Sequence, residues 1–208
     1  LDFSNARIVF QGVEGTYSQL AMKTYFGENC NGYNVDSWKD AMEDIKCGKA
    51  DYAVLPIENS SAGIVSENYD LLVEYDNYIV GEQIIRIDHS LMGLPGAKIS
   101  DIRTVYSHPQ ALMQCSDFFD EHKDINQVAV RNTAFSAKKV KDDGDITQAG
   151  IASHISADIY GLQVLESRIQ NNKNNATRFI IVSAKRVCRR DAGRISICFE
   201  TPHKSGAL

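Results

Sequence analysis

The sequence lacks the features that would place it in a membrane, on nucleic acid or in an oxidising compartment. No apolar run among its 208 residues is long enough to cross a membrane, and its charged, asparagine-containing start does not resemble a signal peptide. Its 22 basic and 27 acidic residues give a net charge of −5, so there is no electrostatic case for binding nucleic acid or an anionic membrane. The five cysteines show neither a CxxC motif nor metal-ligand spacing. We therefore expect no disulfide framework, no metal site and a cytoplasmic location.

Nucleotide-binding motifs are also missing. A strand is predicted over residues 7–11, followed by the glycine loop 12–16 and a helix with apolar residues at helical spacing. The loop contains only Gly12 and Gly15, so it does not match the GxGxxG fingerprint, and no P-loop lysine follows. The loop is compatible with an anion bound at the helix N-terminus, but by itself it is more often a plain strand-to-helix turn.

What the sequence does contain is a repeated strand–turn–helix pattern. With 43% hydrophobic and 24% charged residues it can form a substantial core, and its length allows one large domain or two lobes. Residues 52–57 are almost continuously apolar, as in a strand buried on both faces of a parallel sheet. They end in the polar run 58–63, which includes Asn59 and Ser60. Such a strand end favours ligand binding, and the alternative is a solvated loop with Ser66 capping the next helix.

At least three further turns follow this design. Ser107 and Gln110, like Thr16 and Gln19, have the spacing of a capping box. Each turn alone has a structural explanation, and His108 is more often a cap than a catalyst. Because the carboxyl ends of parallel strands share one edge, the turns together indicate a small anion held mostly by neutral donors. The turns in question follow the strands 7–11, 52–57, 104–106, 128–130 and 149–152.

The stretch 174–179, running into the apolar strand 180–182, combines several polar functions. Arg178 offers a fixed fork of donors suited to a carboxylate, and Thr177 offers an uncharged proton donor. Taken alone, the stretch is equally compatible with a solvated polar turn. Upstream, residues 78–94 are extended without a helical period, which predicts a crossover between two lobes.

The composition changes after Val182. Residues 184–193 form a basic linker, and 194–199 alternate like the first strand of a new domain. A single strand cannot form a domain, so we expect that a further module follows in a longer parent protein.

Four ordered motifs give the chain a family resemblance. Residues 12–18, 56–61, 107–111 and 175–179 resemble the dehydratase domain of prephenate dehydratases, over a region from about Ile8 to Ser183. Residues 202–208 are similar to the start of the ACT regulatory domain that follows in that family. Tyr17 replaces the more usual Phe, and the run 132–135 departs from the family's Ser-Thr-Ala pattern, which weakens the assignment of Asn132 more than that of Thr133.

The resemblance implies an α/β, two-lobed, type 2 periplasmic-binding-protein-like fold with the substrate in a cleft between the lobes. On this basis the dehydratase domain is 1–183, with lobe 1 at 8–82 and 179–183 and lobe 2 at 83–178. Residues 184–193 would be the linker, and 194–208 the start of a truncated ACT domain. The family's upstream chorismate mutase domain is absent, although Leu1 could follow one.

The resemblance also implies the reaction, decarboxylating dehydration of prephenate to phenylpyruvate, with no cofactor. Thr177 would be catalytic, assisting departure of the ring hydroxyl, and Arg178 would grip the pyruvyl carboxylate. The other implied substrate-binding residues are Gly15, Thr16, Asn59, Ser60, Ser107, His108, Gln110, Thr133, Asn175 and Phe179.

Two alternatives remain at the level of sequence. Arogenate dehydratase differs only in a substrate amine where prephenate has a ketone, and no residue decides between them. A non-catalytic small-anion receptor shares the fold but would not need Thr177 beside Arg178, which argues for the enzyme. The family further implies a homodimer or tetramer, and phenylalanine as an effector only when the full ACT module is present.

Overall fold

The structure is a computed structural model that describes residues 3–187 together with 193, 195 and 197. The chain forms two compact units. Unit 1 comprises the chain up to Gln11, Ala21–Ile84 and the chain from Thr177, and unit 2 comprises Gly12–Leu20 and Ile85–Ala176. The glycine loop and the first turn of the following helix, which the sequence assigned to lobe 1, thus belong to unit 2. Most of the predicted linker and ACT strand lies outside the described residues.

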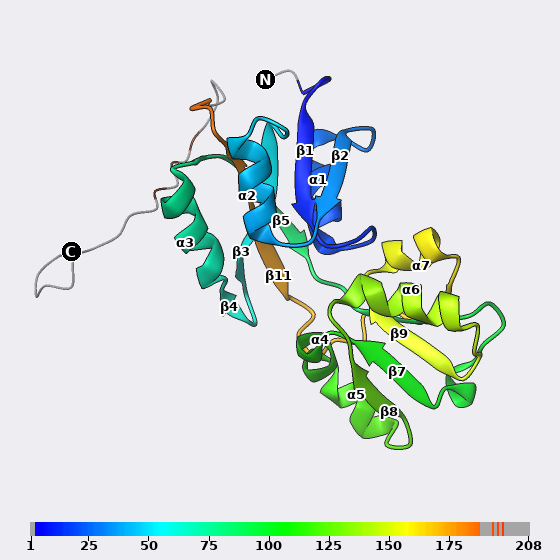
Figure 1. Ribbon diagram of the computed structural model, residues 1–208. Coiled ribbons are helices and arrows are strands. Elements are labelled where there is room, and N and C mark those ends of the chain that lie inside the picture. Colours follow the sequence, from blue (N-terminus) through cyan, green and yellow to red (C-terminus); the bar gives the residue numbers. More distant parts are fainter. Residues whose placement is uncertain (1–2, 188–192, 194, 196, 198–208) are drawn as a thin grey trace, which may run out of the picture. The chain divides into compact units, whose positions relative to one another are not determined.

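Unit 1 is built on one mixed sheet with the strand order β2-β1-β3-β11-β5, and a short strand β4 pairs with β3 (Figure 1). β1 pairs in parallel with β2 and β3, whereas β11 returns antiparallel to β3. The strands are β1 (Arg7–Gln11), β2 (Asn31–Val35), β3 (Tyr52–Asn59), β4 (Gly63–Ile64), β5 (Tyr78–Arg86) and β11 (Ala176–Ser183).

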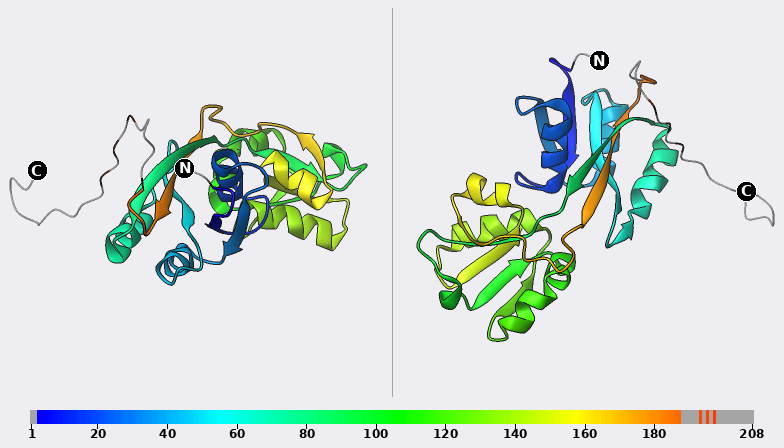
Figure 2. Two further views of the ribbon diagram at one scale, coloured as in Figure 1. Left: turned by 90° about the horizontal axis from the view of Figure 1, so that it is seen from above. Right: turned by 180° about the vertical axis from the view of Figure 1, so that it is seen from behind.

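The helices of unit 1 cover both faces of this sheet. They are α1 (Tyr17–Phe26), α2 (Trp38–Lys46) and α3 (Ser66–Tyr75). α2 and α3 lie on one face, and α1 lies on the other, as the rear view in Figure 2 shows. A capping box of Ser37 with Asp40 starts α2, and its apolar face packs on Leu55 and Ile180. Ser66 does not cap α3, because the helix begins at that residue and has Val65 as its N-cap.

Unit 2 has a second mixed sheet, with the order β10-β6-β9-β7-β8. β7 pairs in parallel with β8 and β9, and β6 runs antiparallel to both β9 and β10. The elements are β6 (Ser90–Gly93), η1 (Ile99–Asp101), β7 (Thr104–Ser107), α4 (Pro109–Gln114), α5 (Ser116–Glu121), β8 (Asn126–Ala129), α6 (Thr133–Asp143), β9 (Gln148–Ala152), α7 (His154–Tyr160) and β10 (Gln163–Glu166).

Each unit has a core of its own. In unit 1, Val9, Leu55 and Ile180 pack with α2 and α3. In unit 2, Leu91 and Ile151 belong to a cluster that includes two phenylalanines of α5, and a second cluster gathers side chains of α6 and α7. The two-lobed α/β architecture expected from the sequence is therefore confirmed.

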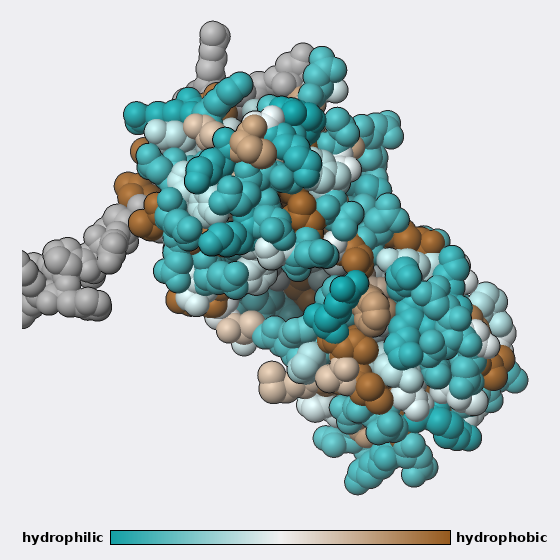
Figure 3. Space-filling model, in the orientation of Figure 1, coloured by the Kyte–Doolittle hydropathy of each residue, from teal (hydrophilic) through white to brown (hydrophobic). Residues whose placement is uncertain are grey.

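Exposed apolar side chains occur on several elements of the described chain. On the face shown in Figure 3, hydrophilic residues predominate. The most exposed large apolar residues of α3, α4 and β4 are Val73, Met113 and Ile64. Among the residues described by the structure, none of the helices has the length and apolar character needed to cross a bilayer.

Candidate active site

A hydrogen-bonded pair of side chains lies where β3 ends and β11 begins. Thr177 is directly opposite Asn59 in the antiparallel register, and Asn59 Nδ2 donates to Thr177 Oγ1 at 2.8 Å. Asn59 Oδ1 accepts from the backbone N–H groups of Ser61 and Ala62 at 2.9 and 2.8 Å. Since only the amide oxygen can accept from those two donors, the turn fixes which end of Asn59 faces the threonine.

This arrangement defines the hydrogen-bonding state of Thr177. Its side chain is nearly buried, with 8% of the residue exposed. The hydroxyl oxygen already accepts from Asn59, so its own proton is the part that remains to donate. A buried hydroxyl with its oxygen held by a fixed donor is suited to giving a hydrogen bond or a proton to another oxygen.

Arg178 has different partners from Thr177. Its Nε donates to Glu82 Oε2 on the neighbouring β5 at 2.9 Å, and its Nη1 lies 4.0 Å from Glu58 Oε2 on β3. In the register of β11 against β3, Arg178 is opposite Glu58 and Thr177 is opposite Asn59, so the two side chains have different cross-strand neighbours. The sequence treated the two side chains as neighbours, whereas the register gives each its own hydrogen-bonding environment.

Phe179 is a core residue. It is 2% exposed, and the pairing of β11 with β3 shifts between Arg178 and Phe179, so that Phe179 is opposite Pro56. Such an irregularity at a strand end changes the local twist and the direction of neighbouring side chains. Ser60, which follows β3, is exposed.

The glycine loop does not form the capping box that the sequence predicted for Thr16 and Gln19. Thr16 Oγ1 donates to the carbonyl of Val13 at 3.0 Å, and Gln19 Oε1 accepts from the N–H of Gly15 at 2.8 Å. Gly15 has φ of +87°, a conformation that other residues rarely adopt. Gln19 therefore accepts from the N–H of Gly15, one residue before the N–H of Thr16 that a capping box would use.

The capping box predicted for Ser107 and Gln110 is also absent. Ser107 is buried and donates to the carbonyl of Ile151 at 2.7 Å. His108 is the N-cap of α4, with Nδ1 accepting from the N–H of Gln110 at 3.2 Å. Burial lowers the pKa of His108, which favours the neutral ring that such an acceptor requires.

Two other predicted residues lie in well-bonded surroundings. Thr133 begins α6, where the neighbouring Asn132 is the N-cap and accepts from the N–H of Phe135 at 2.7 Å. Asn175 is 1% exposed and its Nδ2 donates to Gln114 Oε1 at 3.2 Å. The structure thus gives Asn175 a buried, supporting position.

Gln114 and His89 are residues that the sequence did not single out. Gln114 Oε1 lies 3.0 Å from His89 Nε2 as well as accepting from Asn175. Burial lowers the pKa of His89, so the neutral ring with its proton on Nε2 fits the amide oxygen. In the sequence, Gln114 could have been found only through its position one helical turn after the candidate residue Gln110, which places both on one face of the helix.

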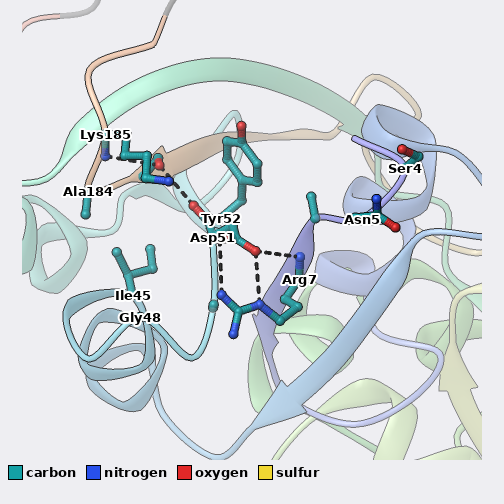
Figure 4. Close-up of a pocket in the computed structure, with 12 residues that line it drawn as sticks. Ser4, Asn5, Arg7, Ile45, Gly48, Asp51, Tyr52, Ala184 and Lys185 are labelled. Carbon is teal, nitrogen blue, oxygen red and sulfur yellow. Dashed lines mark hydrogen bonds and ion pairs between the residues drawn. The ribbon is translucent and has the colours of Figure 1, made fainter. Parts of the chain in front are cut away.

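A cavity of unit 1 lies away from these residues. It has a volume of about 510 Å³ and lies where β1 and β3 begin and β11 ends (Figure 4). Arg7 binds Asp51 there through Nε and Nη2 at 3.1 and 3.2 Å, which lowers the pKa of Asp51. None of the predicted site residues lines this cavity. Across residues 3–187, 193, 195 and 197, no three His, Cys, Asp or Glu side chains gather as metal ligands would.

A family model and curated relatives indicate the same family for this chain. A family model described as prephenate dehydratase matches residues 8–187. Arogenate dehydratase/prephenate dehydratase 1, chloroplastic, from Arabidopsis thaliana is 38% identical over 209 residues, which cover 100% of this chain and 53% of that protein. The bifunctional chorismate mutase/prephenate dehydratase of Escherichia coli K12 is 34% identical, covering 98% of this chain and 54% of its own length.

A solved structure gives the same result. Prephenate dehydratase from Arthrobacter aurescens, in complex with L-Phe, is 30% identical with a TM-score of 0.83, covering 90% of this chain and 63% of that one. The chain spans about half the length of the curated relatives it matches. The resemblance read from the four motifs is thereby confirmed, and the chain belongs to the prephenate dehydratase family.

Proposed function

We propose that this chain catalyses the decarboxylating dehydration of prephenate to phenylpyruvate. The observation that carries the proposal is the Asn59–Thr177 pair, which lies inside the region matched by the family model and presents a fixed hydroxyl donor. In this reaction the ring loses carbon dioxide and, after a proton is supplied, water. The electron pair of the broken carbon–carbon bond enters the ring as the carbon–oxygen bond breaks, so no redox cofactor is required.

Thr177 would donate its proton, or a strong hydrogen bond, to the departing ring hydroxyl. A threonine hydroxyl is a weak acid, so it needs stabilisation as negative charge develops on its oxygen. Asn59 supplies this, because its amide donates to Thr177 Oγ1 and is held in place by the turn at Ser61 and Ala62. A donor fixed before the reaction needs no reorganisation when the charge appears.

Arg178 would bind a substrate carboxylate, most simply that of the pyruvyl group. Its Nε is held by Glu82 at 2.9 Å, which sets the plane of the guanidinium. Glu58 is the weaker partner, at 4.0 Å and with 52% of its side chain exposed. We propose that the substrate carboxylate takes the place of Glu58, while Glu82 stays bound.

The remaining candidates divide into two groups by burial. Ser107, Asn175 and Phe179 are buried, so we assign them supporting rather than contacting roles. The others stay proposed substrate contacts: Gly15 through van der Waals contact of its Cα, and Thr16, Ser60, His108, Gln110 and Thr133 through their side chains.

Arogenate is the second candidate substrate. The observation that favours it is the similarity to the Arabidopsis protein named as both an arogenate and a prephenate dehydratase. The proposal also extends to the biological setting, in which we expect a cytoplasmic homo-oligomer whose parent protein responds to phenylalanine through an ACT module.

The test is a direct assay of this 208-residue chain. Formation of phenylpyruvate from prephenate is followed beside formation of phenylalanine from arogenate, with the Thr177→Val variant as the control for contaminating activity. The proposal predicts turnover of prephenate that the variant loses. If the chain converts arogenate but not prephenate, arogenate is the substrate instead. If a folded chain converts neither compound, the proposal that it is a dehydratase is refuted.

A further inference from the structure

Three hydroxyl groups from one short segment of unit 2 bind the backbone of the glycine loop. They belong to Ser153, Ser156 and Tyr160, and we call them the hydroxyl clamp. We propose that the hydroxyl clamp positions the loop for substrate binding, so that these three side chains determine substrate affinity without touching the substrate. The inference rests on the proposed function, in which Gly15 and Thr16 contact the substrate.

The contacts converge on two consecutive carbonyl groups. Ser153 Oγ and Ser156 Oγ donate to the carbonyl of Gly15 at 3.0 and 3.1 Å, and Tyr160 OH donates to the carbonyl of Glu14 at 2.9 Å. Both lone pairs of the Gly15 carbonyl are thus used by side chains. These donors come from residues far along the chain from the loop, so the loop conformation depends on α7.

The two serines are buried, which makes their bonds costly to lose. Ser153 is 3% exposed and Ser156 is 0% exposed. Removing one hydroxyl would leave the Gly15 carbonyl with one fewer donor in a place that water does not easily reach. Loop geometry is therefore expected to respond to each serine.

Ser153 occupies a position where serine commonly has a different role. It is the N-cap residue of α7, where a serine oxygen ordinarily accepts from a backbone N–H of the first helical turn. Here the side chain makes no such cap and donates to the Gly15 carbonyl instead. The Ser153 hydroxyl therefore stabilises the glycine loop and not the start of α7.

Gly15 fits the clamp because it has no side chain. A Cβ at this position would lie 2.7 Å from Ser156 Oγ, and φ of +87° is strained for any other residue. On its other side, the Gly15 N–H is bound by Gln19. Both polar groups of the Gly15 backbone unit are therefore fixed, and Thr16 follows directly.

The first test is kinetic. Ser153→Ala, Ser156→Ala and Tyr160→Phe each remove one hydroxyl, and each should raise the KM for prephenate roughly two- to ten-fold with little change in kcat. Ser183→Ala is the matched control, because Ser183 is also buried and donates to a backbone carbonyl, that of Asp51, at 2.9 Å. An unchanged KM in all three clamp variants, or an equal rise in the control, would overturn the proposal.

The second test uses the close approach of Gly15 to Ser156. Gly15→Ala should raise KM strongly, and adding Ser156→Ala should restore part of the affinity because it removes the atom that the new methyl group meets. A double variant at least as impaired as the two single variants combined would contradict the clamp.

A third measurement does not depend on activity. Amide hydrogen exchange at Gly15 and Thr16 should become faster in the variant lacking both serine hydroxyls and stay unchanged in Ser183→Ala. Unchanged exchange would refute the clamp itself. An inactive parent chain with faster loop exchange in the serine variants would instead refute the proposed function, and with it the role of the clamp in affinity.

Discussion

The two ends of the unit 1 sheet contain similar chemical groups in different arrangements. At the end where β1 and β3 begin, Arg7 holds Asp51 through two side-chain bonds and a third from the Arg7 backbone N–H. At the other end, Arg178 Nε donates to Glu82 at 2.9 Å, and Glu58 Oε2 lies 4.0 Å from Arg178 Nη1. The first pair is a closed structural contact. In the second, Glu58 is a distant carboxylate that we propose another anion replaces, and Thr177 lies next to Arg178 in the chain.

The comparison teaches that an arginine and a carboxylate do not by themselves make a binding site. The cavity is at the Arg7 end, yet Arg7 is already matched by Asp51 in a bidentate geometry. We expect substrate to bind at the opposite end. There Thr177 and Arg178 are oriented by hydrogen bonds with Asn59 and Glu82, and Glu58 is only a distant partner of Arg178.

The largest effect should follow removal of the Thr177 hydroxyl. Thr177→Val keeps the shape of the side chain, so substrate binding should persist while kcat falls roughly 10²- to 10⁴-fold, the usual contribution of one positioned proton donor. Steady-state kinetics with prephenate measure both constants, and Thr177→Ser should retain most of the activity. A larger kcat loss in His108→Ala would assign the proton donor to the histidine.

Removal of the Asn59 amide should have the next largest effect. Asn59→Ala takes away the donor to Thr177 and the acceptor for two loop N–H groups. We expect kcat to fall roughly 10- to 100-fold, in line with the loss of a buried hydrogen-bonding partner. A change in KM alone would show that Asn59 binds substrate rather than supporting the threonine.

The same conservative substitution at both ends sharpens the comparison directly. Arg178→Lys replaces a planar fork by a point charge and should raise KM about ten-fold, with a smaller effect on kcat. Arg7→Lys makes the identical change in the closed pair and should leave both constants near those of the parent. Equal effects of the two substitutions on KM would contradict the distinction between the ends.

The smallest effect concerns Asp51 and pH. Hydrogen bonds from Arg7 lower the pKa of Asp51 below its ordinary value of 3.8, so its contribution to stability is present above that value and is lost as pH falls through the folded-state pKa. Because the pair is partly exposed, Asp51→Asn should reduce stability only slightly at neutral pH. Thermal unfolding of parent and variant should converge in acid, and a difference that grows in acid would contradict this sign.

Strands and helices could be predicted from the sequence where neighbouring residues carry a clear apolar pattern. The apolar run 52–57 predicted β3, and the strand predicted over residues 7–11 is β1. No strand was predicted at β2 (Asn31–Val35), whose residues are mostly exposed or half-buried at the sheet edge and carry little apolar pattern.

The site shows a sharper limit. Motifs identified Asn59, Thr177 and Arg178, but which face each side chain takes depends on the register of β11 against β3, a long-range pairing. Capping-box spacing misassigned Ser107, because its hydroxyl finds the carbonyl of Ile151 on the neighbouring strand instead of the helix end. The spacing of Ser107 and Gln110 permits a capping box, but the carbonyl that the fold brings next to Ser107 determines which hydrogen bond forms.

The most direct test of the account is a double-mutant cycle on Thr177 and Asn59. If Asn59 acts by setting the threonine hydroxyl, then Asn59→Ala should reduce kcat in the parent chain but cause almost no further loss in the Thr177→Val background. That non-additivity is the predicted result. Losses that multiply in the double variant would mean that the two side chains act independently, and the proposed proton donor would lose its support.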